Sequence, residues 1–249
     1  MIKVAELISY LDKLLTPENF QDYCPNGLQV EGKKKVNKII TGVTACQSLL
    51  DIAVSEKADA VLVHHGYFWK EEKPCIIGMK HKRIATLIDH DINLIAYHLP
   101  LDAHPTCGNN VQLAKILNIE IDTAQEKDSL VLTGKLKTTM LPDAFISHIS
   151  SRLDRKPLYI PGASKTIKTI AWCTGGAQDF IEQAANLKVD AYLTGEVSER
   201  TVHIAREMGV HFFSAGHHAT ERYGIKFLGE HLAAEFGLEC KFIDIDNPV

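Results

Sequence analysis

An internal repeat limits the fold of this chain more than any other feature of its sequence. When the first half is shifted forward by 131 positions, identical residues coincide without a gap: Ile39 with Ile170, Gln47 with Gln178, Ala53 with Ala184, Lys57 with Lys188, Asp59 with Asp190, Ala60 with Ala191 and Leu62 with Leu193. The first copy then carries an insertion, FWKEEKPCIIGMK, before INLIAY and VHFFSA align again. Such self-similarity predicts two related lobes.

Both copies alternate short β-branched runs with helical patterns, which is typical of an α/β fold with largely parallel strands. The expected strands are KIITGV, DAVLV, INLIAY, TIAWC, DAYLTG, VHFFSA and CKFIDI, and the expected helices cover residues 47–56, 83–90, 178–187 and 199–208. Between the copies we expect a strand at SLVLTGKL, a helix over residues 142–153 and a loop. We therefore predict two similar α/β lobes, residues 1–124 and 125–249, related by a pseudo-twofold axis. They can be intertwined, and the C-terminal strand is a candidate to pack with the first lobe.

Composition excludes several other classes of protein. The net charge of -4 gives no general attraction to nucleic acid or to an anionic membrane, so neither is expected as a partner. The opening MIKVAELISYLDKLL has helical spacing without the apolar core of a signal peptide, and no run approaches membrane-spanning length. The six cysteines form no C-x-x-C pair and are predicted to be free thiols. We expect a cytoplasmic protein whose metal chemistry rests on histidine and carboxylate.

Three segments that follow predicted strands are rich in metal-ligating residue types. They are VHHG, with His64 and His65; YHLPLDAHP, with His98, Asp102 and His104; and AGHHATERYG, with His217, His218 and Glu221. In open α/β sheets, ligands bind at the carboxyl ends of the strands. We therefore predict a metal site in the cleft between the two lobes.

The spacing of these residues suggests how they bind. His217 and Glu221 are four apart at a predicted helix start, so both project from one face. The adjacent His64 and His65 point to opposite sides of a strand, unless a bend at Gly66 turns them together. They fit more naturally on two ions about 3.5–4 Å apart. Either Glu221 or Asp102 could bridge such a pair, and imidazole with carboxylate suits zinc, iron, manganese, cobalt or nickel.

Two further motifs allow more than one interpretation. TGE, which ends at Glu196, lies opposite the histidine pair in the repeat, so Glu196 either caps the next helix or orients a metal ligand. CTGGAQ resembles a phosphate-binding turn but lacks both the G-x-G-x-x-G and the Walker pattern.

The motifs CPNGLQVEG, VTACQ, ADAVLVHHGYFW, YHLPLDAHP, GNN, WCTGGAQ, DAYLTGEVSE and AGHHATER together resemble those of one family. This is the family of GTP cyclohydrolase 1 type 2 homologues, the Nif-three-like dinuclear-metal proteins, in its short bacterial form. The resemblance implies two α/β lobes around a dinuclear metal centre, and a toroidal homohexamer. It places the metal ligands at His64, His65, Asp102, His217 and Glu221, with Glu221 bridging. His98 matches a nearby histidine of the family, which implies that it either supports a metal ligand or carries a proton. Cys24 stands at a position where the family motif usually has alanine.

Two functions follow as expectations. In the first, the chain is a metal-dependent hydrolase of a small polar or nucleotide-like substrate, with His98 and Glu221 as the catalytic residues. Two divalent ions would activate water and hold a substrate oxygen, while a histidine protonates the leaving group. The family label makes the substrate GTP. In the second, the chain is a non-catalytic hexameric assembly or interaction protein whose metals are structural or held for delivery.

Overall fold

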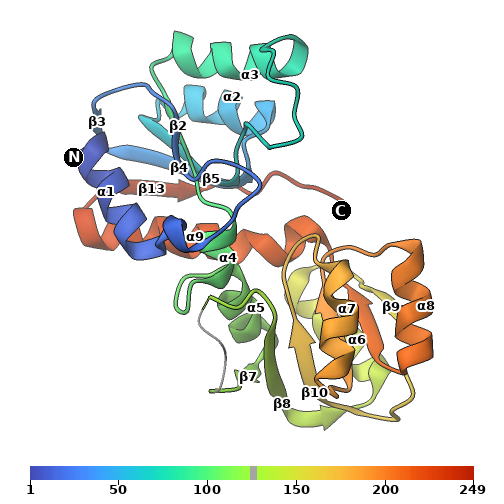
Figure 1. Cartoon of the computed structure of the whole chain (residues 1–249). Helices are drawn as coiled ribbons and strands as arrows, with labels where there is room; N and C mark the ends of the chain where they lie inside the picture. The colour runs from blue at the N-terminus through green and yellow to red at the C-terminus, as the bar shows by residue number, and fades with distance from the viewer. Residues whose placement is uncertain (124–127) are drawn as a thin grey trace. The chain divides into compact units, whose positions relative to one another are not determined.

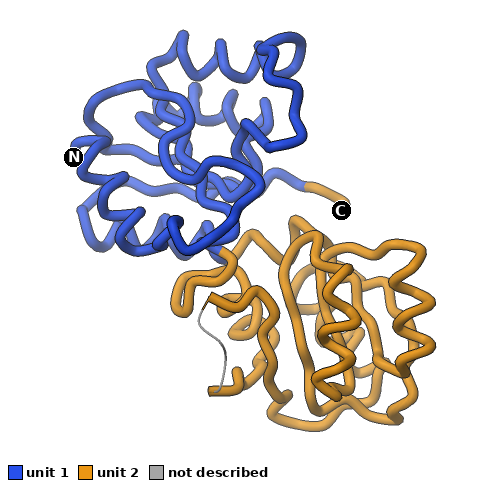
Figure 2. The backbone as a smooth tube through the Cα atoms, viewed as in Figure 1, with its two compact units in different colours: residues 1–101, 224–246 blue, residues 102–223, 247–249 orange. Residues whose placement is uncertain are grey.

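A computed structural model describes residues 1–123 and 128–249 (Figure 1). It separates into two compact units (Figure 2): unit 1 comprises Met1–Leu101 and Gly224–Asp246, and unit 2 comprises Asp102–Tyr223 and Asn247–Val249. The predicted boundary between residues 124 and 125 lies outside the described residues. The units divide the chain elsewhere, because residues 102–123 belong to unit 2 and residues 224–246 to unit 1.

Unit 1 is a five-stranded sheet in the order β13-β4-β5-β6-β2. Its strands are β2 (Gly27–Val30), β4 (Lys38–Thr44), β5 (Ala60–His65), β6 (Asn93–Ala96) and β13 (Glu239–Phe242). All pairs are parallel except β2 with β6, which is antiparallel. The predicted C-terminal strand thus joins the sheet of the first half of the chain.

Helices cover both faces of this sheet. Residues of α2 (Gln47–Ser55) and α3 (Gly78–Asp89) share a buried cluster with β4, β5 and β6. Helix α9 (His217–Phe236) crosses the other face, where Gly229 lies so close to Thr41 that a Cβ would be 2.9 Å from its methyl group. Helix α1 (Val4–Leu15) buries one stripe at helical spacing, made of Val4, Leu7, Leu11 and Leu15. Short elements β1 (Ile2–Lys3), β3 (Lys35–Val36), a 3-10 turn (Pro17–Asn19) and α4 (Leu99–Ala103) complete the connections.

Unit 2 is a six-stranded sheet in the order β7-β8-β10-β11-β12-β9. Its strands are β7 (Ile119–Ile121), β8 (Leu132–Met140), β9 (Leu158–Ile160), β10 (Ile167–Trp172), β11 (Ala191–Thr194) and β12 (His211–Ser214), and its helices are α5 (Asn109–Leu117), α6 (Pro142–Leu153), α7 (Ile181–Asn186) and α8 (Glu199–Met208). Two sequence expectations were wrong in detail. The loop expected after residue 153 contains β9, an edge strand too short to show a pattern, and the helix expected over 178–187 begins as a 3-10 turn (Gln178–Phe180).

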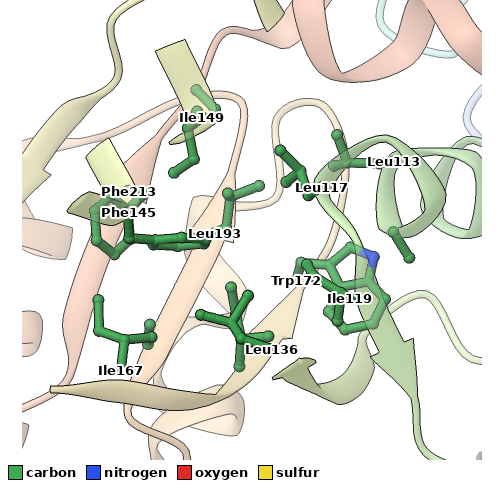
Figure 3. Close-up of a cluster of buried hydrophobic side chains, with 14 of the residues drawn as sticks. Leu113, Leu117, Ile119, Leu136, Phe145, Ile149, Ile167, Trp172, Leu193 and Phe213 are labelled. Atoms are coloured by element: carbon green, nitrogen blue, oxygen red, sulfur yellow. The ribbon is translucent and has the colours of Figure 1, made fainter. Parts of the chain in front are cut away.

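Each face of the unit 2 sheet carries its own core. Phe145 of α6 packs with Trp172, Leu193 and Phe213 in the cluster shown in Figure 3. Residues of α7 and α8 pack on the neighbouring positions Ala171, Tyr192 and Phe212. Successive strand residues point to opposite faces, so each strand serves both cores.

The repeat seen in the sequence is also present in the topology. The series β4-β5-β6-β2 and β10-β11-β12-β9 have the same order and the same strand directions. Ile39 pairs with Ala60 in the first copy, and their repeat equivalents Ile170 and Ala191 pair in the second. The α/β fold is therefore confirmed, whereas the pseudo-twofold axis stays a prediction. Among the described residues, no helix is both long and apolar enough to cross a membrane.

Candidate metal centre

Unit 1 gathers three imidazoles at the ends of β5 and β6. We call His64, His65 and His98 the imidazole cluster. Their ring centroids are 4.5 Å (His64 to His65), 5.0 Å (His64 to His98) and 5.6 Å (His65 to His98) apart. One ligand atom from each lies within 4.8 Å of the other two. The sequence predicted this meeting for His64 and His65 only through a bend, and β5 does end at His65, before Gly66.

A hydrogen bond fixes the tautomer of His64, which is fully buried. Its Nδ1 lies 3.0 Å from the carbonyl oxygen of Tyr97. A carbonyl only accepts hydrogen bonds, so Nδ1 carries the proton and Nε2 of the neutral ring keeps its lone pair. Metal-ligating histidines usually have such an outer partner. His65, less buried, has Nδ1 3.2 Å from the hydroxyl of Thr44.

His98 is held by Asp22, a residue that the sequence analysis did not single out. Asp22 Oδ1 lies 2.6 Å from His98 Nδ1, and Asp22 is 8% exposed. Burial by itself raises the pKa of Asp22, but the hydrogen bond and charge of His98, with hydrogen bonds from Asn26 and Tyr23, lower it to about 2. Asp22 is therefore ionised at neutral pH.

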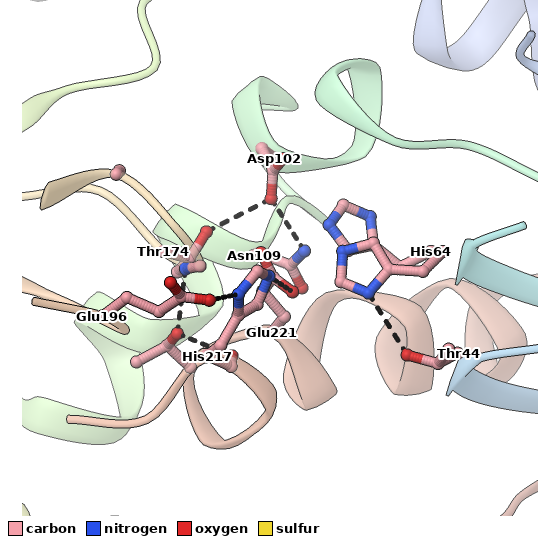
Figure 4. Close-up of polar contacts among 12 residues, drawn as sticks. Thr44, His64, Asp102, Asn109, Thr174, Glu196, His217 and Glu221 are labelled. Carbon is pink, nitrogen blue, oxygen red and sulfur yellow. Dashed lines mark hydrogen bonds and ion pairs between the residues drawn. The ribbon is translucent and has the colours of Figure 1, made fainter. Parts of the chain in front are cut away.

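Unit 2 gathers two carboxylates and one imidazole. We call Asp102, His217 and Glu221 the carboxylate cluster. Glu221 is 3% exposed, and its ligand atoms come within 4.8 Å of those of Asp102 and of His217. Asp102 Oδ1 accepts hydrogen bonds from Asn109 Nδ2 at 2.9 Å and from Thr174 Oγ1 at 3.2 Å (Figure 4). These two donors fix the orientation of the Asp102 carboxylate.

His217 and Glu221 lie one turn apart at the start of α9, as their spacing predicted. His217 Nε2 is 3.1 Å from Glu221 Oε2, and His217 Nδ1 is 2.6 Å from Glu196 Oε1 (Figure 4). Burial lowers the pKa of His217, but its hydrogen bonds and ion pairs with Glu221 and Glu196 outweigh burial and raise the pKa to about 9. Of the two readings for Glu196, the structure supports orientation of a candidate ligand, since the capping box of α8 is formed by Ser198 and Thr201.

One donor pair of the carboxylate cluster passes a geometric test for metal binding. Metal–ligand bonds of about 2.0–2.2 Å at near-tetrahedral angles place two donors about 3.4 Å apart, close to the separation of His217 and Glu221. The loop of Gly175 makes room for this carboxylate, because a Cβ there would overlap Glu221 Oε1. These residue groups could therefore hold a metal ion. Of the other histidines in the three segments, His104 Nδ1 accepts a hydrogen bond from Cys107 N, and His218 N donates to Val249 O.

Comparison with known proteins gives full-length matches. The family model described as Duf34/NIF3 (NGG1p interacting factor 3) matches residues 2–248. A Pseudomonas aeruginosa protein is 55% identical over 250 residues, 99% of each chain, and a Pasteurella multocida protein is 57% identical over 250 residues, 99% of this chain and 100% of the relative. Both are called GTP cyclohydrolase 1 type 2 homolog.

Two solved structures are also similar along the whole chain. One, titled as protein ybgI of unknown function, is 53% identical with a TM-score of 0.97. The other, the protein TTHA1606 from Thermus thermophilus, is 34% identical with a TM-score of 0.91. Each match covers 100% of both chains. The resemblance drawn from the motifs is thereby confirmed.

Proposed function

We propose that this chain, which belongs to the DUF34/NIF3 family, is a cytoplasmic hydrolase in which the imidazole and carboxylate clusters together hold two divalent metal ions. The ligands would be His64, His65, Asp102, His217 and Glu221, with Glu221 shared between the ions. The ions could be zinc, iron, manganese, cobalt or nickel, which accept nitrogen and oxygen donors.

One observation carries this proposal: candidate ligands in both clusters are already oriented by outer hydrogen bonds. Tyr97 O fixes His64, and Thr174 and Asn109 fix Asp102. Glu196 fixes His217 in the same way. Buried polar groups held like this are typical of metal sites, where outer partners set ring orientation and ligand basicity.

The chemistry would be hydrolysis of a small polar molecule. Two bound divalent ions lower the pKa of water and polarise a substrate oxygen. The chain itself would supply two catalytic residues. His98, held by Asp22, would carry the proton to the leaving group, and the buried Glu221 would be the carboxylate shared between the ions. Relatives called GTP cyclohydrolase 1 type 2 homolog make GTP the first nucleotide to test.

Metal content tests the ligand set. Wild-type protein and the variants His64→Ala and Glu221→Gln are dialysed against zinc, manganese or iron and measured by inductively coupled plasma mass spectrometry. The exposed His81 of α3, changed to Ala, is the matched control. We expect two ions per chain in the wild type and the control, and fewer in both ligand variants. Equal metal content in all four proteins would rule out these ligands.

Turnover tests the hydrolase. Metal-loaded protein is incubated with GTP, with formate release followed, and then with a panel of phosphate esters, amides and cyclic ureas. Rates must exceed those of Glu221→Gln under the same conditions. Two retained ions without turnover on any substrate would instead support the non-catalytic assembly protein.

We further propose that the chain forms the toroidal homohexamer implied by the family resemblance. Large exposed apolar side chains support an interface between copies of this chain. At the start of α3, Ile77 is 73% exposed and Met79 is 66% exposed. Light scattering of the purified protein tests this, and a monomeric mass would contradict it.

A further inference from the structure

We infer that Asp22 is a positioning residue that holds the His98 imidazole in one tautomer, with the proton on Nδ1 and the lone pair on Nε2. This inference deepens the proposed function and rests on it for the catalytic role of His98. The hydrogen bonds that carry this inference all lie within unit 1.

The Asp22 carboxylate is surrounded by hydrogen-bond donors. Oδ1 accepts from Tyr23 N at 2.6 Å, and Oδ2 accepts from Asn26 Nδ2 at 2.9 Å and from Leu99 N at 3.0 Å. His98 Nδ1 is the fourth partner, at 2.6 Å from Oδ1. An ionised carboxylate only accepts hydrogen bonds, so His98 Nδ1 must donate.

A second contact fixes the backbone of His98. Its N–H donates to Asn26 Oδ1 at 2.8 Å, while the amide nitrogen of the same Asn26 donates to Asp22. Asn26 therefore ties the carboxylate to the main chain beside the ring. Because the backbone N–H and the ring Nδ1 of His98 are both held by hydrogen bonds, the ring is not expected to rotate to offer its other nitrogen to Asp22.

The ring surroundings give this arrangement a chemical use. The His98 ring lies 5.0 Å from those of His64 and Trp69, and 6.4 Å from that of Tyr23, measured between centroids. In the neutral ring, the nitrogen that does not face Asp22 keeps a lone pair, and the ring lies 5.0 Å from that of His64 and 5.6 Å from that of His65. It can take up a proton there and later release it, as a histidine does when a buried aspartate holds its Nδ1.

The substitution Asp22→Asn should invert the tautomer. With its amide oxygen toward Asn26 and Leu99 N, the new side chain keeps those two hydrogen bonds, loses the one from Tyr23 N and turns its amide nitrogen toward His98. With the opposite orientation it would keep the hydrogen bond from Tyr23 N but set its N–H₂ group against two donors, Asn26 and Leu99 N. The first orientation is therefore favoured, and it requires His98 Nδ1 to accept, which moves the proton to Nε2.

Nuclear magnetic resonance measures the tautomer directly. Two-bond nitrogen–proton spectra of the uniformly ¹⁵N-labelled, metal-free full chain are recorded at alkaline pH, where histidine side chains are ordinarily neutral. His98 is assigned from its loss in His98→Gln. We expect a protonated Nδ1 in the wild type and a protonated Nε2 in Asp22→Asn. A wild-type ring protonated at Nε2 would overturn the inference, even if the variant failed to fold.

Kinetics then separate positioning from a purely structural role. With any substrate that the hydrolase screen yields, we expect Asp22→Asn to lower kcat about 10- to 100-fold, with KM and bound metal unchanged. Asp59→Asn is the matched control, because the Asp59 carboxylate also accepts from two backbone N–H groups, those of Asn37 and Lys38. An equal kcat loss in both variants would overturn the inference. Since the spectra need no turnover, failure of the hydrolase screen contradicts the proposed function alone.

Discussion

The substitution Gly175→Ala tests how closely the carboxylate cluster is packed. Gly175 follows β10 with φ +69°, a left-handed conformation that costs a residue with a side chain about 1–2 kcal/mol. An added Cβ would overlap Glu221 Oε1 and lie 3.1 Å from His217 Nε2. The loop cannot easily retreat, because Gly175 N donates to Thr220 Oγ1 and Gly175 O accepts from Gly195 N.

We expect this variant to lose about 2–5 kcal/mol of unfolding free energy, from the left-handed conformation together with overpacking. It should also bind zinc more weakly, since Glu221 must move. Urea unfolding followed by circular dichroism measures the first effect, and isothermal titration of the metal-free protein measures the second.

The neighbouring Gly176 provides a matched control. It lies in the same loop, but a Cβ there would be 3.5 Å from His217 Cε1, an ordinary contact. Gly176→Ala should stay within about 0.5 kcal/mol of the wild type, as most surface changes do, and should bind zinc normally. Equal stability and equal zinc affinity for the two variants would refute the packing of Glu221 against residue 175.

Three further measurements follow from the structure. In metal-free protein, the His217 pKa of about 9 exceeds its ordinary 6.5. Protonated His217 should therefore contribute on the order of 3 kcal/mol to the free energy of unfolding below pH 6.5, and this contribution is lost as pH rises through 9. Urea unfolding in chelator at several pH values checks this, and Glu196→Gln should flatten the pH dependence. Zinc added at pH 8 should displace this proton, which titration in buffers of different ionisation enthalpy detects; no release would count against His217 as a ligand. Asp190→Ala should cost about 1–3 kcal/mol of unfolding free energy, because Asp190 Oδ2 accepts from Lys168 N and Thr169 N. The exposed Asp89 in the last turn of α3 is the control, and Asp89→Ala should change little.

The sequence predicted the parallel core of each unit because repeated β-branched runs carry a strong pattern. It could not predict the antiparallel edge strands β2 and β9, since β2 precedes β4 in the chain but pairs with β6, and β9 pairs with β12. Three-dimensional pairing, rather than local pattern, decides such positions. The missed residue Asp22 has the same cause: β2 runs antiparallel to β6, which brings the segment before β2 to the end of β6, where His98 lies 76 positions away in sequence.

The candidate ligands could be predicted because they follow strands and combine residue types that metals prefer. Their supporting residues could not. Asn109 and Thr174 are ordinary polar residues in the sequence, and only the fold brings both to Asp102. Glu196 was found because the repeat aligns it with His65, which gave a reason to examine it. A supporting residue is visible in a sequence only where some second pattern marks it.

The divergence of the two copies divides the chemistry between the units. At equivalent strand ends, the first copy has His64 and His65 and the second has Gly195 and Glu196. As metal ligands, imidazoles are neutral nitrogen donors, whereas the carboxylates of Asp102 and Glu221 would bring negative charge. Because divalent ions need charge compensation as well as donors, we expect substitutions in the carboxylate cluster to lower affinity for every divalent metal. Substitutions in the imidazole cluster should mainly change the preference among metals, since nitrogen donors distinguish zinc and nickel from manganese. Competition titrations of Asp102→Asn and His65→Asn with zinc and manganese compare the two, and the same loss for both metals in His65→Asn would contradict this division.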